Sequence, residues 1–171
     1  MPSYFLVMLQ ALYYAQFHSI ISYGLIFWGH TTPSLKVFRL QKRIVRIMTG
    51  SMPKDSCRNL FTKLEILPLP SLYIFNLLRF VRKNKEFFIT NNETHNCDTR
   101  QCADLHYPSV KLKKFQTGAH YMGIKIYSYL PTYIKIEINN AKKFDQFLKK
   151  FLLDKSFYSL EEFCNLDYGY I

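Results

Sequence analysis

The strongest constraint on the fold is the segment 34–50, whose charged and apolar residues fall on different faces only if the segment forms a helix. Its cations recur at intervals of 3, 4 and 3 residues, so an α-helix gathers them on one face: Lys36, Arg39, Arg43 and Arg46. Its apolar residues fall on another side and predict a face buried in a core: Val37, Leu40, Ile44, Ile47 and Met48. We expect Ser34 to cap the start of this helix and Gly50 to cap its end.

The net charge of the chain suggests a role for this basic face. The 171 residues carry a formal net charge of +11, with a pI near 9.5. A cationic helix face on a basic chain favours binding to a polyanion, most directly nucleic acid. The alternative is a solvated helix face without a ligand. Hydrophobic residues make up 49% of the chain, which excludes a disordered polypeptide and predicts one domain with a substantial core.

The first thirty residues contain no Asp, Glu, Lys or Arg. The stretch Phe5–Trp28 is long enough to span a bilayer, but glutamine, histidine and serine interrupt it. We therefore expect a helix over residues 5–21 that is buried on most sides, and no membrane span. No basic n-region precedes the apolar run, which argues against a secretory signal. The four unevenly spaced cysteines indicate a reducing compartment.

Further helices follow from the spacing of apolar residues. We expect one over residues 72–85, capped by Ser71, and an amphipathic one over residues 141–153. Ser159, with Glu162 three residues later, predicts a last capped turn. The fold class is therefore mostly α, a single helical domain with a small irregular lobe near residues 90–130. We divide it into a helical region (1–86), a polar loop region (87–118) and a C-terminal helical region (119–171) that packs on the first.

Few side chains in this sequence are arranged for catalysis or metal binding. Two histidines and two cysteines offer zinc ligands, but in the spacing C-x4-C-x3-H, and we expect a polar loop instead: His95, Cys97, Cys102 and His106. Glu161 and Glu162 are the only adjacent acids, so the clustered carboxylates of two-metal phosphoryl transfer are missing. A Cys/His or Ser/His pair stays open, because such partners are neighbours in space rather than in sequence. We predict no catalytic residue, no metal and no cofactor.

Basic residues also alternate with aromatic residues in later segments, around Phe80, at 111–115 and at 149–151. Phosphate neutralisation with occasional base stacking uses this combination. The alternative for any one cluster is an amphipathic helix whose lysine stems cover the edge of the core. Their repetition favours polyanion binding. The candidate nucleic-acid-binding residues are Lys36, Arg39, Lys42, Arg43, Arg46, Arg79, Arg82 and Lys83.

Several strings resemble, in their order, a known protein family. They are ALYYAQFHS at residues 11–19, SYG at 22–24, FWG at 27–29, LQKRIVRI at 40–47, PSLYI at 70–74, TR at 99–100, and MGIKIY at 122–127 before Leu130-Pro131. Together they are similar to the C-terminal portion, the thumb and the region after the palm, of a jockey-like non-LTR retrotransposon reverse transcriptase. The resemblance extends from about residue 8 to residue 163.

The resemblance implies an RNA-directed DNA polymerase as the parent protein, with residues 1–86 as a thumb-like region. It implies that Lys42, Arg43 and Arg46 contact the backbone of a primer–template duplex. The aromatic-Ala-Asp-Asp motif of the palm and the endonuclease domain have no counterpart in this sequence, and Cys97 stands where an aromatic residue is expected. Magnesium would then serve only the intact polymerase, and this chain by itself is not expected to be an enzyme.

We therefore expect a non-catalytic fragment that binds DNA or RNA through backbone phosphates, without sequence specificity and without a small-molecule substrate. Two alternatives stay open. One is a membrane-associated protein with residues 5–28 inserted and the basic helix at an anionic lipid surface. The other is an orphan structural module without a ligand, whose exposed apolar surface would favour aggregation.

Overall fold

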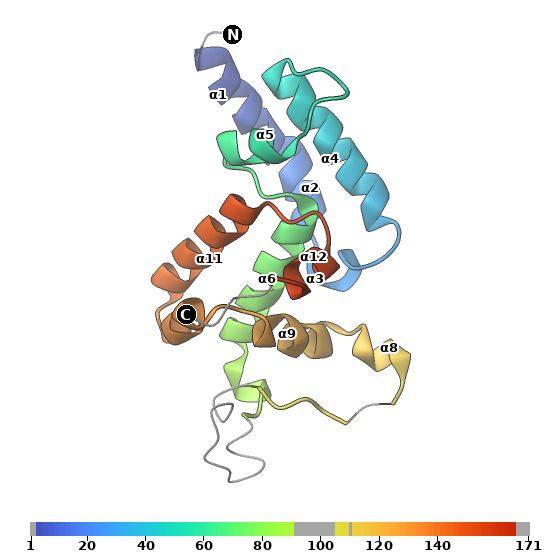
Figure 1. The fold of residues 1–171 in the computed structure, drawn as a ribbon, viewed down its shortest axis with the longest axis vertical. Coiled ribbons are helices and arrows are strands. Elements are labelled where there is room, and N and C mark those ends of the chain that lie inside the picture. The colour runs from blue at the N-terminus through green and yellow to red at the C-terminus, as the bar shows by residue number, and fades with distance from the viewer. Residues whose placement is uncertain (1–2, 91–104, 110, 167–171) are drawn as a thin grey trace.

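The computed structural model describes residues 3–90, 105–109 and 111–166, and over these ranges the chain is mostly helical (Figure 1). The expected mostly-α fold class is confirmed. In chain order the longer helices are α1 (Ser3–Leu12), α4 (Ser34–Thr49), α6 (Leu69–Lys83), α9 (Ala119–Ser128) and α11 (Ala141–Lys155). Between them lie shorter helical pieces: η1 (Tyr13–His18), α2 (Ser19–Ser22), α3 (Leu25–Trp28), α5 (Arg58–Lys63), η2 (Lys85–Phe87), α8 (Lys113–Gln116), α10 (Thr132–Lys135), η3 (Ile136–Asn139) and α12 (Leu160–Cys164).

Helix α6 is the axis of the fold. It begins with Pro70 in its first turn, where the missing N–H would have had no helical partner. Helices α3, α4, α9 and α11 pack around it, and its buried residues therefore occupy several sides: Leu69, Ser71, Leu72, Tyr73, Ile74, Leu77, Leu78 and Val81. Buried residues from Tyr13 to Phe163 form one hydrophobic cluster, so the helices before residue 86 and after residue 119 share a core.

Two of the expected helix caps are wrong. Ser34 is the first residue of α4, and no side chain caps that helix. The chain enters α4 through a turn in which the N–H groups of Ser34, Leu35 and Lys36 bond to carbonyls of residues 31–33, so these donors need no cap. Ser71 lies inside α6, where its buried hydroxyl donates to the carbonyl of Phe157 at 3.4 Å.

Two other expected caps are confirmed. Gly50 ends α4 with a φ of +65°, a left-handed conformation in which glycine has no steric penalty. The N–H of Gly50 bonds to the carbonyl of Ile47, and that of Ser51 to the carbonyl of Arg46, which is the Schellman arrangement. Ser159 caps α12 by accepting the N–H of Glu162 at 3.0 Å.

The first helix is not buried on most sides, and that expectation was wrong. The pieces α1, η1 and α2 follow one another without a break from Ser3 to Ser22, close to the predicted 5–21, but only Tyr13 and Ile21 are buried. Leu6 packs against the core, and from Leu9 onward four core-facing residues recur every four positions: Leu9, Tyr13, Phe17 and Ile21. The π-helical piece η1 has wider turns than an α-helix, and this keeps the four residues on one side. The opposite side faces solvent.

The expected buried face of α4 was wrong in part: Met48 is buried and Val37 and Ile44 pack against the core, but Leu40 and Ile47 do not. Its buried residues are Ser34, Phe38, Gln41, Val45 and Met48. Leu40 and Ile47 are 54% and 64% exposed. The ring of Phe38 stacks on Phe61 and meets the edge of Tyr158, and these contacts bring the Phe38 side of the helix into the core. The basic stripe therefore shares the solvent side with aliphatic residues.

The predicted helix over residues 141–153 is confirmed as α11, and its face holds Phe144, Leu148, Phe151 and Leu152 in the core. The predicted irregular lobe near residues 90–130 contains two helices in its described part, α8 and α9. Helix α9 packs along α6, and Gly123 permits this because a Cβ there would lie 2.6 Å from a methyl carbon of Val81. Within the described residues, no helix is both long and apolar enough to cross a membrane.

Candidate nucleic-acid interface

A buried glutamine fixes the position of helix α4. The amide nitrogen of Gln41 donates to the hydroxyl of Tyr13 at 2.8 Å and to the carbonyl of Leu67 at 2.9 Å. Its amide oxygen accepts the N–H of Leu69 at 2.8 Å. Gln41 is fully buried, and three of its four hydrogen-bonding positions are used. These bonds connect α4 to the first helix and to the start of α6, so the solvent face of α4 is held in one orientation.

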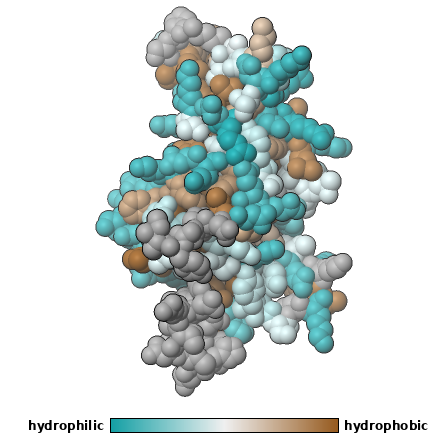
Figure 2. Space-filling model, in the orientation of Figure 1, coloured by the Kyte–Doolittle hydropathy of each residue, from teal (hydrophilic) through white to brown (hydrophobic). Residues whose placement is uncertain are grey.

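Three cations on that solvent face are free. Lys36, Arg39 and Arg43 are exposed, and their side chains have no partner among the residues that the structure describes. Seven residues separate the first from the last, which is about 10 Å along the helix axis. Hydrophilic side chains project from the side of the molecule where α4 lies, with apolar surface between them (Figure 2). We call Lys36, Arg39 and Arg43 the α4 stripe.

The other two predicted cations of α4 have structural partners. The guanidinium of Arg46 donates twice to the backbone carbonyl of Asp55, at 3.1 and 2.9 Å, and so fastens the loop after the helix. The ammonium of Lys42 lies over the rings of Phe38 and Tyr158, 4.8 and 5.5 Å from their centres. Both side chains are partly buried. They still add positive potential beside the α4 stripe, but their first role is packing.

The predicted basic residues of α6 lie elsewhere. Arg79 and Arg82 pair with Asp145 of α11, at 3.2 and 3.9 Å. The guanidinium of Arg82 also lies over the ring of Phe144. Lys83 is exposed at the end of α6. Figure 1 places this end of α6 in the opposite half of the molecule from α4, so the structure does not bring the two predicted clusters together.

A tyrosine that the sequence reasoning missed, Tyr158, packs against Phe38 and Lys42 of α4. Tyr158 receives the guanidinium of Arg58 at 4.6 Å on its ring, in addition to Lys42, and burial raises the pKa of its hydroxyl to about 12. Arg58 also forms an ion pair with Glu162 at 2.6 Å. Burial acts to raise the pKa of the Glu162 carboxyl, but the bonds from Arg58 and from the backbone N–H of Tyr158 outweigh it and lower that pKa. No sequence motif pointed to this cluster, because its members are about one hundred residues apart.

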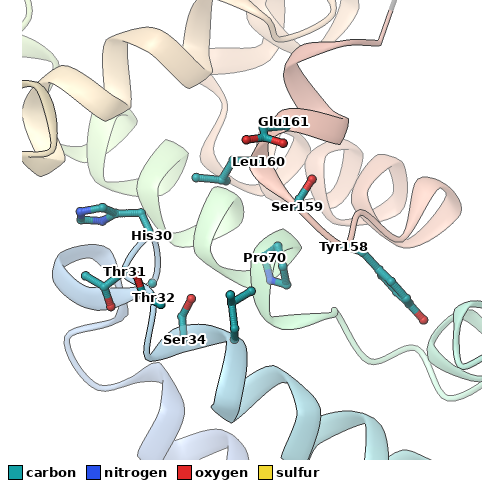
Figure 3. A pocket seen from close by; sticks show the side chains of 11 residues that line it. His30, Thr31, Thr32, Ser34, Pro70, Tyr158, Ser159, Leu160 and Glu161 are labelled. Carbon is teal, nitrogen blue, oxygen red and sulfur yellow. The ribbon is translucent and has the colours of Figure 1, made fainter.

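A pocket of about 450 Å³ opens near the start of α4, between His30, Pro70 and the loop before α12 (Figure 3). Its polar side chains do not converge, since the rings of His30 and Tyr158 point away from each other. The Nδ1 atom of His30 is buried without a hydrogen-bond partner, and burial lowers the pKa of this imidazole. A serine–histidine nucleophile would need a hydrogen bond between the two side chains, and this pocket does not have one at Nδ1.

The loose zinc motif cannot be placed. His95, Cys97 and Cys102 lie outside the described residues, and the backbone N–H of His106 bonds to the carbonyl of Ile89 at 2.8 Å. Among residues 3–90, 105–109 and 111–166, no three side chains of the metal-binding types form a group.

Comparison with known proteins found no matching family model, curated protein or solved structure.

Proposed function

We propose that this chain binds nucleic acid through backbone phosphates, using the α4 stripe as its main contact surface. We further propose, on the strength of the ordered sequence strings, that it is a non-catalytic relative of the C-terminal part of a retrotransposon reverse transcriptase. On this proposal the chain reads charge and backbone shape, and it has no preference for particular bases. Among the residues that the structure describes, no side chain of the stripe has a hydrogen-bond or ion-pair partner, so its cations are available to phosphates.

The observation that carries the proposal is the contrast between the stripe and the other predicted cations. Arg46 already donates to the carbonyl of Asp55, and Arg79 and Arg82 already form ion pairs with Asp145. Lys36, Arg39 and Arg43 have no such acceptor in the described part of the chain and lie on one helix. A cation without a partner loses little when it meets a phosphate, whereas a paired one must first give up its existing interaction. The overall charge of +11 adds long-range attraction.

Salt dependence follows from the number of contacts. Three phosphate contacts predict a slope of log K against log salt concentration of about −2.7 for duplex DNA and about −2.1 for a single strand. Raising the salt from about 50 to about 200 mM would then weaken binding to a duplex roughly 40-fold. Aliphatic Leu40 and Ile47 lie beside the stripe and offer no stacking surface, so bases should contribute little.

The test compares two variants with the same loss of charge. In the first, Lys36, Arg39 and Arg43 are replaced by Gln. In the second, the exposed residues Lys142, Lys143 and Lys150 of α11 are replaced by Gln. Binding to a fluorescent duplex of mixed sequence is followed by anisotropy at several salt concentrations.

We expect the first variant to lose most of its affinity and to show a slope near zero, and the second to keep a slope within about one unit of the parent. Equal losses in the two variants would mean that net charge alone drives binding, and the stripe would lose its role. A polymerase assay with magnesium should give no templated incorporation. Synthesis by this chain would overturn the proposal that it is non-catalytic.

A further inference from the structure

The solvent side of the first helix is an unusually large apolar surface. Its members alternate around the side away from the core and are 40–83% exposed: Tyr4, Phe5, Val7, Met8, Leu12 and Ile20. We call these six residues the α1–α2 face. The largest exposed apolar patch of a protein is often a contact site for another surface. None of the six makes a hydrogen bond through its side chain among the described residues.

The geometry of this face suits a second helix. Tyr4, Met8 and Leu12 are four residues apart and so form a ridge along α1. Ala11 and Ala15, which are exposed on the same helix, follow Tyr4, Met8 and Leu12 by three or seven residues, and their short side chains leave room beside the ridge. Ridges of this spacing pack into the grooves of a second helix of the same kind, at a crossing angle of about 50°. The face therefore carries both halves of a self-complementary contact, as a two-fold interface requires.

The charge distribution favours a second copy of this chain on the same face. Two molecules of net charge +11 repel each other over most of their surfaces. Residues 1–30 contain no Asp, Glu, Lys or Arg, so two α1–α2 faces can meet without bringing like charges into contact. A lipid surface fits less well, because helices that lie in a membrane interface carry Lys or Arg along their polar side. The first helix has neither residue.

The exposed area is close to what a dimer requires. If a large apolar side chain offers ~150–200 Å² when fully exposed, the six residues present on the order of 600 Å². A stable interface buries about 800 Å² on each partner, and the alanines and polar residues beside the ridge can supply the difference. We propose that two copies of this chain pair through their α1–α2 faces, with the two first helices crossing. This proposal goes beyond nucleic-acid binding and does not depend on it.

Sedimentation velocity of the full chain, without nucleic acid, tests the proposal. Between about 1 and 100 µM we expect a monomer–dimer equilibrium that shifts to dimer at higher salt, because salt screens the repulsion between basic chains. Met8→Glu and Leu12→Glu, at positions that are already exposed, should each weaken dimerisation at least about tenfold. Ile136→Glu is the control, since Ile136 is 70% exposed and lies outside this face.

The proposal fails if the parent chain stays monomeric at about 100 µM, if it forms a ladder of larger aggregates, or if Ile136→Glu weakens association as much as Met8→Glu. Circular dichroism of each variant checks that it is folded. Ala15→Glu changes a further exposed position of the first helix and serves as an additional variant. Monomeric protein that pellets with vesicles of anionic phospholipid, with pelleting lost in Met8→Glu and kept in Ile136→Glu, would assign the face to membranes instead. Nucleic-acid binding is measured separately on the Met8→Glu variant. If the parent chain is a monomer that binds nucleic acid in a salt-sensitive way, only the dimer proposal is refuted. If it is a dimer that does not bind nucleic acid, only the proposed function is refuted.

Discussion

Replacing Gln41 by Met tests whether this side chain holds helix α4 in place. Methionine has a similar length and volume, so the change removes hydrogen bonds without leaving a large cavity. Gln41 is fully buried and makes three bonds of 2.8–2.9 Å, to Tyr13, Leu67 and Leu69. Among the described residues, the carbonyl of Leu67 and the N–H of Leu69 have no other hydrogen-bond partner. In the Gln41→Met variant, the carbonyl of Leu67 and the N–H of Leu69 would be buried without a hydrogen-bond partner.

The expected loss of stability follows from these groups. A buried donor or acceptor without a partner costs about 1–3 kcal/mol. Three such groups, with partial relaxation of the chain around them, predict a destabilisation of about 3–5 kcal/mol. Replacing Tyr13 by Phe removes only one bond and should cost about 1–2 kcal/mol. In the Gln41→Met background the same tyrosine substitution should cost close to nothing, since its hydroxyl then has no partner to lose.

Urea unfolding of the four proteins in this cycle measures both quantities. The midpoints should shift while the slope of free energy against urea concentration stays constant. Gln16→Met is a control, because Gln16 is an exposed glutamine on the same first helix and its replacement should change stability by less than about 0.5 kcal/mol. A loss below about 1 kcal/mol for Gln41→Met, or additive effects of the two substitutions, would refute the claim that this network orders α4.

Gly50→Ala should cost only about 1 kcal/mol, because a Cβ there has open space and the strain comes from the positive φ alone. Gly123→Ala should cost about 2–3 kcal/mol by urea unfolding, because its Cβ would lie 2.6 Å from a packed carbon of Val81; equal losses at the two glycines would contradict this contrast. Burial is the main cause that lowers the pKa of His18 and of His30 in the folded chain. As the pH falls, these two imidazoles are therefore protonated in the unfolded chain before they are protonated in the folded chain. The free energy of unfolding should therefore fall as the pH drops through 6.5, and His18→Gln with His30→Gln should reduce this slope.

Local patterns in the sequence were enough to locate the main helices. The alternation of phenylalanine and lysine over 141–153 predicted α11, and the glycine and serine signals at Gly50 and Ser159 predicted a helix end and a helix start. These features depend on residues within one or two turns of each other. The basic stripe also followed from spacing alone, and its first three cations, Lys36, Arg39 and Arg43, are exposed on α4.

Which of the predicted cations have partners depended on contacts between distant segments. Arg79 and Arg82 meet Asp145, and Arg46 meets the backbone of Asp55, so charge spacing alone overestimated the number of free cations. Spacing places Gln41 on the same side of the helix as Phe38 and Val45. Because glutamine is polar, nothing in the sequence predicted that it lies in the core.

The order and lengths of the helices are properties of the chain itself, because backbone hydrogen bonds and side-chain periodicity act over a few residues. Which sides of each helix are buried is decided by the packing of the whole molecule. The first helix has apolar residues all round, yet its neighbours cover one side only, and its other side faces solvent. Burial depends on what the rest of the chain places against a surface, and a single helix cannot specify that by its own composition.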